Sequence, residues 1–246
     1  MIIIISPAKK LDTSVKVQNS KMNTSFLGES KKLIQTLKGK SISELKDLMG
    51  LSDNLAQLNW QRFQDWDIEN RNTYKALELF NGAVYEGVNA KKFNKSDNDF
   101  AQNNLRILSG LYGILKPNDL ILPYRLEMGT KLKTIKGNNL YRFWQDKLYQ
   151  NIVEELNNEV LINLASNEYS KVLKLNKIKS EVITPVFKDY KNGKLKVISF
   201  FAKRARGEMV NFIIKNRITS PEELKSFKNN GYAFSEESNG QLLFAR

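Results

Sequence analysis

The sequence predicts a mixed α/β fold in a single domain of residues 1–246, with a central sheet, a helical N-terminal portion and a C-terminal β-hairpin. Three observations support this prediction. Short apolar runs alternate with amphipathic stretches along the chain, and 41% hydrophobic residues suffice for a buried core. No internal repeat and no Pro- or Ser-rich linker divides the 246 residues.

Strands are predicted where β-branched and apolar residues form short continuous runs, as they do in buried sheets. Four such runs are expected to share one sheet: residues 2–5, 160–164, 181–187 and 195–202. Near the end of the chain, residues 231–234 and 241–245 flank a polar turn at 236–240. This pattern predicts a β-hairpin.

Helices are predicted where apolar residues recur at three- and four-residue spacing. This spacing occurs over residues 26–37, 42–49, 54–66, 97–108, 139–156 and 204–214. Ser41 with Glu44, and Ser96 with Asp99, have the spacing of capping boxes. Residues 220–223, Ser-Pro-Glu-Glu, have the cap, the proline and the acids that favour a helix start.

Charge is concentrated in one segment of this basic protein. The formal net charge is +13, and residues 171–217 contain thirteen basic residues against Glu181, Asp189 and Glu208, a local net charge of +10. A polyanion, nucleic acid first, is the expected partner of such a segment, although a merely solvated lysine-rich face is the alternative. Apolar residues interleave with these charges, so the segment should be folded.

Several function classes are excluded by composition. The chain has no Cys and no His, which removes disulfides, Cys or His nucleophiles, zinc fingers and thiolate iron–sulfur sites. We expect no metal site and no cofactor. The longest early apolar run, residues 2–5, is too short for a signal peptide or a membrane span. We therefore expect a cytoplasmic protein with no membrane partner. We also expect a monomer.

Two stretches are candidate anion sites. Ser6 to Lys10 follow the first predicted strand, at the edge where open α/β sheets place ligand crevices, so Lys9 could face an anion. Residues 203–207, Lys-Arg-Ala-Arg-Gly, are expected to open a helix, where cationic side chains and the helix dipole both attract phosphate. The alternative for Arg206 is an internal ion pair with Glu127 or Glu168.

A third stretch, residues 42–66, predicts two helices around a short break at Gly50-Leu51-Ser52 and resembles a helix-hairpin-helix element. Such a hairpin offers backbone N–H groups to a phosphate without reading base sequence. An ordinary antiparallel helix pair is the alternative.

Motifs along the whole chain resemble the bacterial YaaA family of peroxide-stress proteins. The motifs are SPAK at 6–9, SDNLA at 52–56 with Arg62-Phe63 and Trp66, LSGLYG at 108–113, PYRLEMG at 123–129, NLASNEY at 163–169 and KRARG at 203–207. The resemblance implies an unusual α/β fold and binding of double-stranded DNA through a positively charged cleft and a helix-hairpin-helix element. It also implies a role in limiting damage from hydrogen peroxide and intracellular iron.

Two functions from different classes therefore remain open. The first is a DNA-binding stress protein that grips phosphates without sequence specificity, through Lys9, Lys10, Ser52, Lys171, Lys203, Arg204 and Arg206. The second is an enzyme that acts on a small anionic substrate or a DNA lesion, through a polar cluster of Ser6, Ser109, Tyr112, Arg125, Glu127, Asn163, Ser166, Glu168 and Tyr169. A buried network that fixes the loops beneath a basic cleft would place the same polar residues together.

Overall fold

A computed structural model describes residues 1–69 and 72–246. Its strands are β1 (Ile2–Ile5), β2 (Lys10–Leu11), β3 (Val17–Gln18), β4 (Asn72–Lys75), β5 (Phe80–Asn81), β6 (Leu105–Ser109), β7 (Gly113–Leu115), β8 (Leu120–Ile121), β9 (Leu161–Asn163), β10 (Val182–Lys191), β11 (Lys194–Lys196), β12 (Lys228–Asn229), β13 (Tyr232–Ser238) and β14 (Gln241–Ala245).

The helices alternate with these strands, as a mixed α/β fold requires. They are α1 (Leu27–Lys38), α2 (Ile42–Met49), α3 (Asp53–Gln64), α4 (Ala76–Leu79), α5 (Ala83–Val88), η1 (Ala90–Lys92), α6 (Lys95–Asn104), α7 (Leu140–Trp144), α8 (Lys147–Leu156), α9 (Asn167–Ser170), η2 (Lys171–Leu173), η3 (Leu175–Lys177), α10 (Ser199–Asn216) and η4 (Pro221–Ser226). Within the described residues, no helix is both long enough and apolar enough to cross a bilayer.

The central sheet has the strand order β12-β13-β14-β10-β9-β1-β6-β7, with β11 paired to β10. Strand β1 lies between β9 and β6 and runs parallel to both, with Ile3 opposite Ile162 and Leu105. All four isoleucines of β1 are buried, because the sheet is covered on both of its faces. The carboxyl ends of these three strands therefore meet at one edge.

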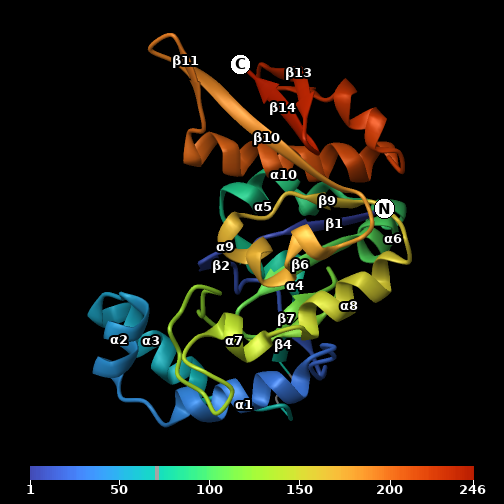
Figure 1. The fold of residues 1–246 in the computed structure, drawn as a ribbon. Helices are drawn as coiled ribbons and strands as arrows, with labels where there is room; N and C mark the ends of the chain where they lie inside the picture. The colour runs from blue at the N-terminus through green and yellow to red at the C-terminus, as the bar shows by residue number, and fades with distance from the viewer. Residues whose placement is uncertain (70–71) are drawn as a thin grey trace.

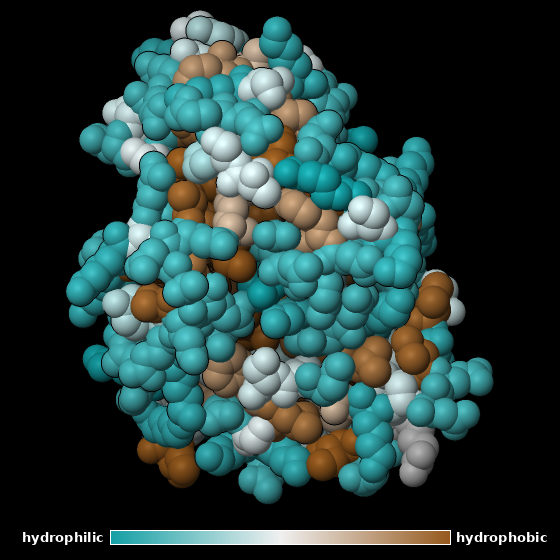
Figure 2. Space-filling model, turned by 90° about the vertical axis from the view of Figure 1, so that its right-hand side faces the viewer, coloured by the Kyte–Doolittle hydropathy of each residue, from teal (hydrophilic) through white to brown (hydrophobic). Residues whose placement is uncertain are grey.

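The molecule is elongated in Figure 1, with α1, α2 and α3 at one end and α10 with the strands β13 and β14 at the other. The face in Figure 2 is mostly hydrophilic, and hydrophobic residues show in a hollow below the upper part and in separate groups along the lower part.

Most of the predicted elements are confirmed. The strands predicted at 2–5, 160–164 and 181–187 are β1, β9 and β10 of the same sheet, and the C-terminal hairpin is β13 with β14. The helices predicted at 26–37, 42–49 and 54–66 are α1, α2 and α3. Ser41 and Glu44 form their capping box, and Ser220 caps the 3-10 helix η4.

Two predicted elements at the sheet and its edge are wrong. Residues 97–108 do not form one helix, because α6 ends at Asn104 and the next residues form β6, whose five side chains are all buried beside β1. Residues 195–202 do not form one strand. The strand β11 ends at Lys196 and α10 begins at Ser199, since Ala202, Ala205 and Met209 are buried at helical spacing.

Two local predictions are also wrong. The capping box of α6 uses Asn94 and Asp97 in place of Ser96 and Asp99, and Asp97 takes part in ion pairs as well. The helix predicted over 139–156 is divided into α7 and α8 at Gln145, whose φ of 43° cannot continue a right-handed helix.

Helices α5 and α10 touch through their backbones at two glycines. A Cβ atom on Gly207 would lie 1.8 Å from the carbonyl oxygen of Val84, and one on Gly87 would lie 2.4 Å from the carbonyl oxygen of Arg204. Both of these neighbours are backbone atoms, which cannot turn aside as a side chain can. The two helices can therefore approach this closely only with glycine at both positions.

We predict that Gly207→Ala lowers the free energy of unfolding by about 1–3 kcal/mol or more, because overpacking forces the two helices apart. Urea denaturation measures this change. Gly28→Ala in α1 is the matched control, because its Cβ would meet nothing within 4 Å. The control should leave stability unchanged or raise it by up to about 1 kcal/mol. Equal effects of the two substitutions would contradict the close approach.

Candidate functional site

A cavity of about 320 Å³ opens at the carboxyl ends of β1 and β9, where the sequence predicts a ligand crevice. Four parts of the chain line it: residues 6–10 after β1, residues 81–85 at the start of α5, residues 124–127, and residues 164–169 after β9. Lys203 and Arg206 on α10 complete the lining. The contact between α5 and α10 lies next to the cavity, since Val84 lines the cavity and its carbonyl oxygen lies against Gly207.

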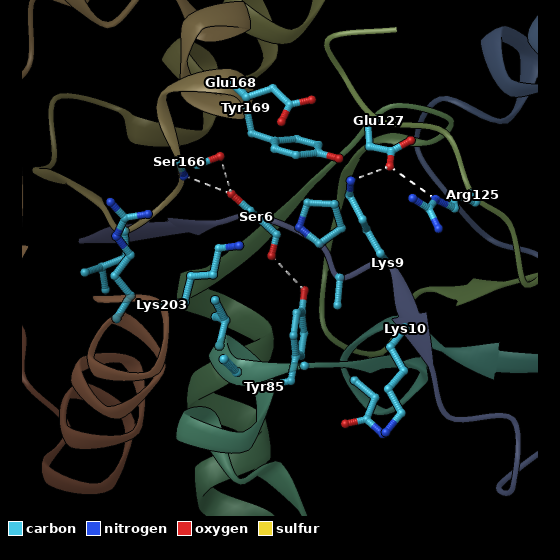
Figure 3. A pocket seen from close by; sticks show the side chains of 18 of the residues that line it. Ser6, Lys9, Lys10, Tyr85, Arg125, Glu127, Ser166, Glu168, Tyr169 and Lys203 are labelled. Carbon is cyan, nitrogen blue, oxygen red and sulfur yellow. Dashed lines mark hydrogen bonds and ion pairs between the residues drawn. The ribbon is translucent and has the colours of Figure 1, made fainter. Parts of the chain in front are cut away.

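The Ser6 side chain joins the ends of β1 and β9. Its Oγ accepts a hydrogen bond from the Ser166 N–H at 2.9 Å and donates to the Ser166 Oγ at 3.2 Å. The Ser6 carbonyl accepts from the Tyr85 hydroxyl at 3.0 Å (Figure 3). These hydrogen bonds hold the first strand, the loop after β9 and α5 together around the cavity.

Glu127 brings two cations to one oxygen atom. Its Oε1 lies 3.0 Å from the Lys9 Nζ and 3.2 Å from the Arg125 Nε (Figure 3). The Glu127 and Arg125 side chains are about 15% exposed, whereas that of Lys9 is 67% exposed. The second oxygen, Oε2, has no hydrogen bond or ion pair with any residue that the structure describes.

Glu168 and Tyr169 form another wall of the cavity. The Glu168 Oε1 accepts from the Gly129 N–H at 3.0 Å, which ties the loop of residues 123–129 to α9. Burial raises the pKa of Tyr169 above its ordinary value, as it does the pKa of Tyr85 and of Tyr124. The three phenols that line the cavity therefore stay neutral at physiological pH.

Three members of the predicted polar cluster, Ser109, Tyr112 and Asn163, do not line the cavity. Ser109 hydrogen-bonds the Tyr124 hydroxyl at 2.6 Å and accepts the Tyr112 N–H at 2.8 Å. The Tyr112 hydroxyl accepts from the Trp66 Nε1–H at 2.9 Å. Asn163 accepts the Ala165 N–H at 3.2 Å. These three residues have buried hydrogen-bond partners that fix loops, whereas Ser6, Arg125, Glu127, Ser166, Glu168 and Tyr169 face the cavity.

The cationic motif at 203–207 does not open a helix, contrary to the prediction. Helix α10 begins four residues before Lys203, because Ser199 to Ala202 are its first turn. Lys203 and Arg206 therefore reach the cavity from the side of the helix. The alternative for Arg206, an ion pair with Glu127 or Glu168, is absent from the described residues, and burial lowers the pKa of its guanidinium.

Of the other predicted phosphate ligands, Lys10 lines the cavity, whereas Arg204, Lys171 and Ser52 lie outside it. Arg204 pairs with Glu208 at 3.1 Å and does not line the cavity. Lys10 lines the cavity and is exposed. The Lys171 ammonium lies 5.4 Å from the centre of the Tyr141 ring, outside the cavity. Ser52 is exposed at the start of α3, and Figure 1 shows α2 and α3 at the other end of the molecule from α10.

Sequence reasoning missed two groups at this site. Tyr85 lies in no quoted motif and Tyr124 only within PYRLEMG at 123–129, and neither was predicted as a site residue, because a tyrosine in an apolar stretch has the same pattern whether it packs in a core or lines a cavity. The β10–β11 hairpin carries three exposed lysines, Lys191, Lys194 and Lys196. The charge pattern predicts a basic segment but not that these lysines lie together on a hairpin. Asn192-Gly193 between them is a typical hairpin turn that could have located them.

Internal ion pairs neutralise part of the basic segment. Lys174 pairs with Asp146, Arg204 with Glu208, and both Lys215 and Arg217 with the buried Asp97. Nine of the thirteen basic side chains have no ion pair with a residue that the structure describes: Lys171, Lys177, Lys179, Lys188, Lys191, Lys194, Lys196, Lys203 and Arg206. In the described part of the chain, no group of three or more carboxylates is arranged to hold a metal ion.

Comparison with known proteins agrees with this whole-chain organisation. The family model described as "Peroxide stress protein YaaA" matches residues 1–238. The chain belongs to this family. A UPF0246 protein from Teredinibacter turnerae (strain ATCC 39867 / T7901) is 48% identical over 254 aligned positions, which cover 100% of this chain and 99% of that relative. Membership of the YaaA family supports a role related to peroxide stress.

We predict that Asp97 makes this YaaA-family protein sensitive to acid. The Lys215 ammonium, 2.5 Å away, is the largest influence that lowers the pKa of Asp97 from 3.8 to about 2. Because the folded value is below the unfolded value, the stabilisation is present above about pH 4 and disappears as the pH falls toward 2.

Asp97→Asn should therefore be less stable than the parent at pH 7, and the difference should shrink between pH 4 and pH 2. Urea denaturation at several pH values measures it. Asp99→Asn, on the same helix with an exposed partner, Lys95, is the control and should have a small effect. A stability difference for Asp97→Asn that stayed constant with pH would contradict the assignment.

Proposed function

We propose that this peroxide stress protein binds double-stranded DNA through the phosphate backbone and without sequence specificity. The observation that carries the proposal is the set of nine cations in residues 171–217 without an ion-pair partner in the described chain. Duplex DNA carries a dense row of phosphates, and each cation that neutralises one releases a counterion. Unpaired cations at fixed positions suit this role better than cations already held by carboxylates.

The β10–β11 hairpin supports the proposal by its shape and charge. Strand β10 pairs with β14 as far as Lys188, and the strand partner of its last three residues is β11, while the Tyr190 N–H also donates to the Arg246 carbonyl at 2.8 Å. Figure 1 shows this hairpin projecting beyond the rest of the molecule. Its one acidic residue, Asp189, is buried and is held by Arg246 at 2.6 Å. The exposed Lys191, Lys194 and Lys196 therefore face solvent with no carboxylate among them.

The cavity extends the same basic region. Lys10, Lys203 and Arg206 line the cavity, and in Figure 1 the strand β2, the helix α9, the first turns of α10 and the projecting hairpin all lie toward the left of the view. Because α10 follows β11 directly in the chain, we propose that a duplex on the hairpin also reaches Lys203 and Arg206. The interactions proposed here are with phosphates, which position a protein on DNA but do not read sequence.

The helix-hairpin-helix-like element gives weaker support. Residues 42–66 carry two basic and four acidic side chains. One of the bases, Lys46, is paired with Asp53 at 2.6 Å in the described structure. Any phosphate binding there would depend on the backbone N–H groups after Gly50 and at Ser52, against a local net negative charge. We therefore propose that the main DNA-binding surface lies at the hairpin and the cavity.

A second candidate function is catalysis on a small anionic substrate or a DNA lesion. It is favoured by the cavity, because Glu127 and Glu168 lie at its wall with one carboxylate oxygen each that has no partner in the described chain. A carboxylate so placed could act as a general base near neutral phenols. A chemical product that the parent protein forms from DNA, and that Glu127→Gln does not form, would favour this candidate.

We predict that DNA affinity falls steeply with salt and hardly varies with sequence. Changing Lys191, Lys194 and Lys196 together to Gln should reduce the slope of log affinity against log salt by roughly 0.9 for each phosphate that the variant no longer neutralises. Titrations of a short duplex at several salt concentrations measure the slope.

The matched control is the same change at Lys31, Lys32 and Lys38 on α1, which are exposed and have no ion pair with a described residue. Both triple variants remove three charges, so only a local interaction with DNA distinguishes them. Equal slopes for the two variants would show that the hairpin binds no phosphate, and affinity independent of salt would overturn the electrostatic proposal.

A further inference from the structure

We propose that the cavity binds one nucleotide, with its phosphate at the α10 side and its base among the tyrosines. The nucleotide can be free, or it can be a nucleotide extruded from a DNA duplex. The second case rests on the proposed DNA binding, whereas the first does not. Three features of the cavity point to this ligand: its size, the unpaired cations on one side with carboxylate oxygens elsewhere on its wall, and its apolar aromatic lining.

The size suits a small ligand. A volume of about 320 Å³ is at the lower end of the range of roughly 300–1,000 Å³ for small-molecule pockets. A single nucleotide has this scale, whereas a duplex does not enter such a space. DNA can therefore reach the interior only by placing one nucleotide inside it.

The two sides of the cavity differ in whether their cations are paired. On one side, Lys203 and Arg206 of α10 have no ion pair with a described residue, and Arg206 is half-buried. On the other side, Glu127 holds Lys9 and Arg125, and Figure 3 shows Lys203 and Glu127 at opposite sides of Ser6. An anion is therefore favoured near α10. The Glu127 side favours a group that donates N–H bonds.

The lining between these sides is apolar and aromatic. The residues Tyr85, Tyr124 and Tyr169 are at most 7% exposed and line the cavity with Leu164. Aromatic side chains can stack on nucleobases of any sequence. The carboxylate oxygens of Glu127 and Glu168 that have no described partner can accept from the N–H groups on a base edge. Inorganic phosphate would interact with neither the aromatic lining nor these carboxylate oxygens. The two features therefore favour a ligand that has a base as well as a phosphate.

The first experiment uses free ligands and calorimetric titration of the whole protein. Guanosine monophosphate is the probe, because its base edge presents several N–H donors, and inorganic phosphate and guanosine are the comparison ligands. We expect the nucleotide to bind at least about tenfold more tightly than either part alone. Equal affinities for the nucleotide and inorganic phosphate would exclude a base site.

Variants assign the two sides of the cavity. Arg206→Gln should remove most of the advantage of the nucleotide over guanosine, while Glu127→Gln should reduce its advantage over phosphate. Arg142→Gln is the matched control for charge, because Arg142 is exposed, lies outside the cavity and has no ion pair with a described residue. Thermal melting checks that each variant folds. If Glu127→Gln does not fold, Arg206→Gln still tests the proposal, and an unchanged nucleotide affinity in it would contradict the phosphate position.

The second experiment compares two duplexes that differ by one unpaired nucleotide. Extruding a base costs less when it is mismatched or unpaired. We therefore expect at least about tenfold tighter binding to the duplex with one unpaired guanosine than to the paired duplex. Arg206→Gln should lower this ratio, and Arg142→Gln should not.

The outcomes separate this inference from the proposed function. If both duplexes bind equally and the free nucleotide does not bind, the proposed DNA binding is supported and the proposed nucleotide site is wrong. If the free nucleotide binds but neither duplex does, the nucleotide site stands for free ligands and the proposed DNA binding fails.

Discussion

The close backbone packing of α5 on α10 determines where the chemistry of this protein can lie. Gly207 touches the Val84 carbonyl, and Gly87 touches the Arg204 carbonyl, so the two helices are held together at two points along their length. Val84 and Tyr85 of α5 line the cavity, and so do Lys203 and Arg206 of α10. One packing interaction therefore fixes the apolar floor and the cationic side together. It also fixes the start of α10 and hence the base of the β10–β11 hairpin, which immediately precedes it.

Ion pairing then divides the many cations into two groups. Asp97, 2% exposed, holds Lys215 and Arg217 at the far end of α10, which joins this helix to α6. Lys203, Arg206 and the hairpin lysines have no such partner in the described chain. Of these unpaired cations, Lys203 and Arg206 line the cavity, and Lys191, Lys194 and Lys196 lie on the hairpin that precedes α10. For a member of the peroxide stress family, this surplus supports the proposal that the partner is a polyanion.

The sequence predicted the parts of this arrangement that depend on local pattern. The four isoleucines of β1 could only be a buried strand, and Ser6 after it, with Glu127 and Glu168 in polar loops, marked the cavity. Errors arose where a pattern fits two structures. The run that forms β6 continues the helical spacing of α6, and Phe200-Phe201-Ala202 are as apolar as a strand, although both phenylalanines are exposed on a helix. Partners distant in sequence, such as Asp97 with Lys215, have no local signature, so the charges left unpaired could not be foreseen.

The most direct measurement is a structure of the protein with a short DNA duplex. It locates the phosphates relative to the cations that the fold leaves unpaired. We expect phosphate oxygens within hydrogen-bond distance of the hairpin lysines and of Lys203 or Arg206, with the duplex running past the mouth of the cavity. A complex in which the duplex lies on α2 and α3, or on the face shown in Figure 2, with no phosphate near α10, would contradict it.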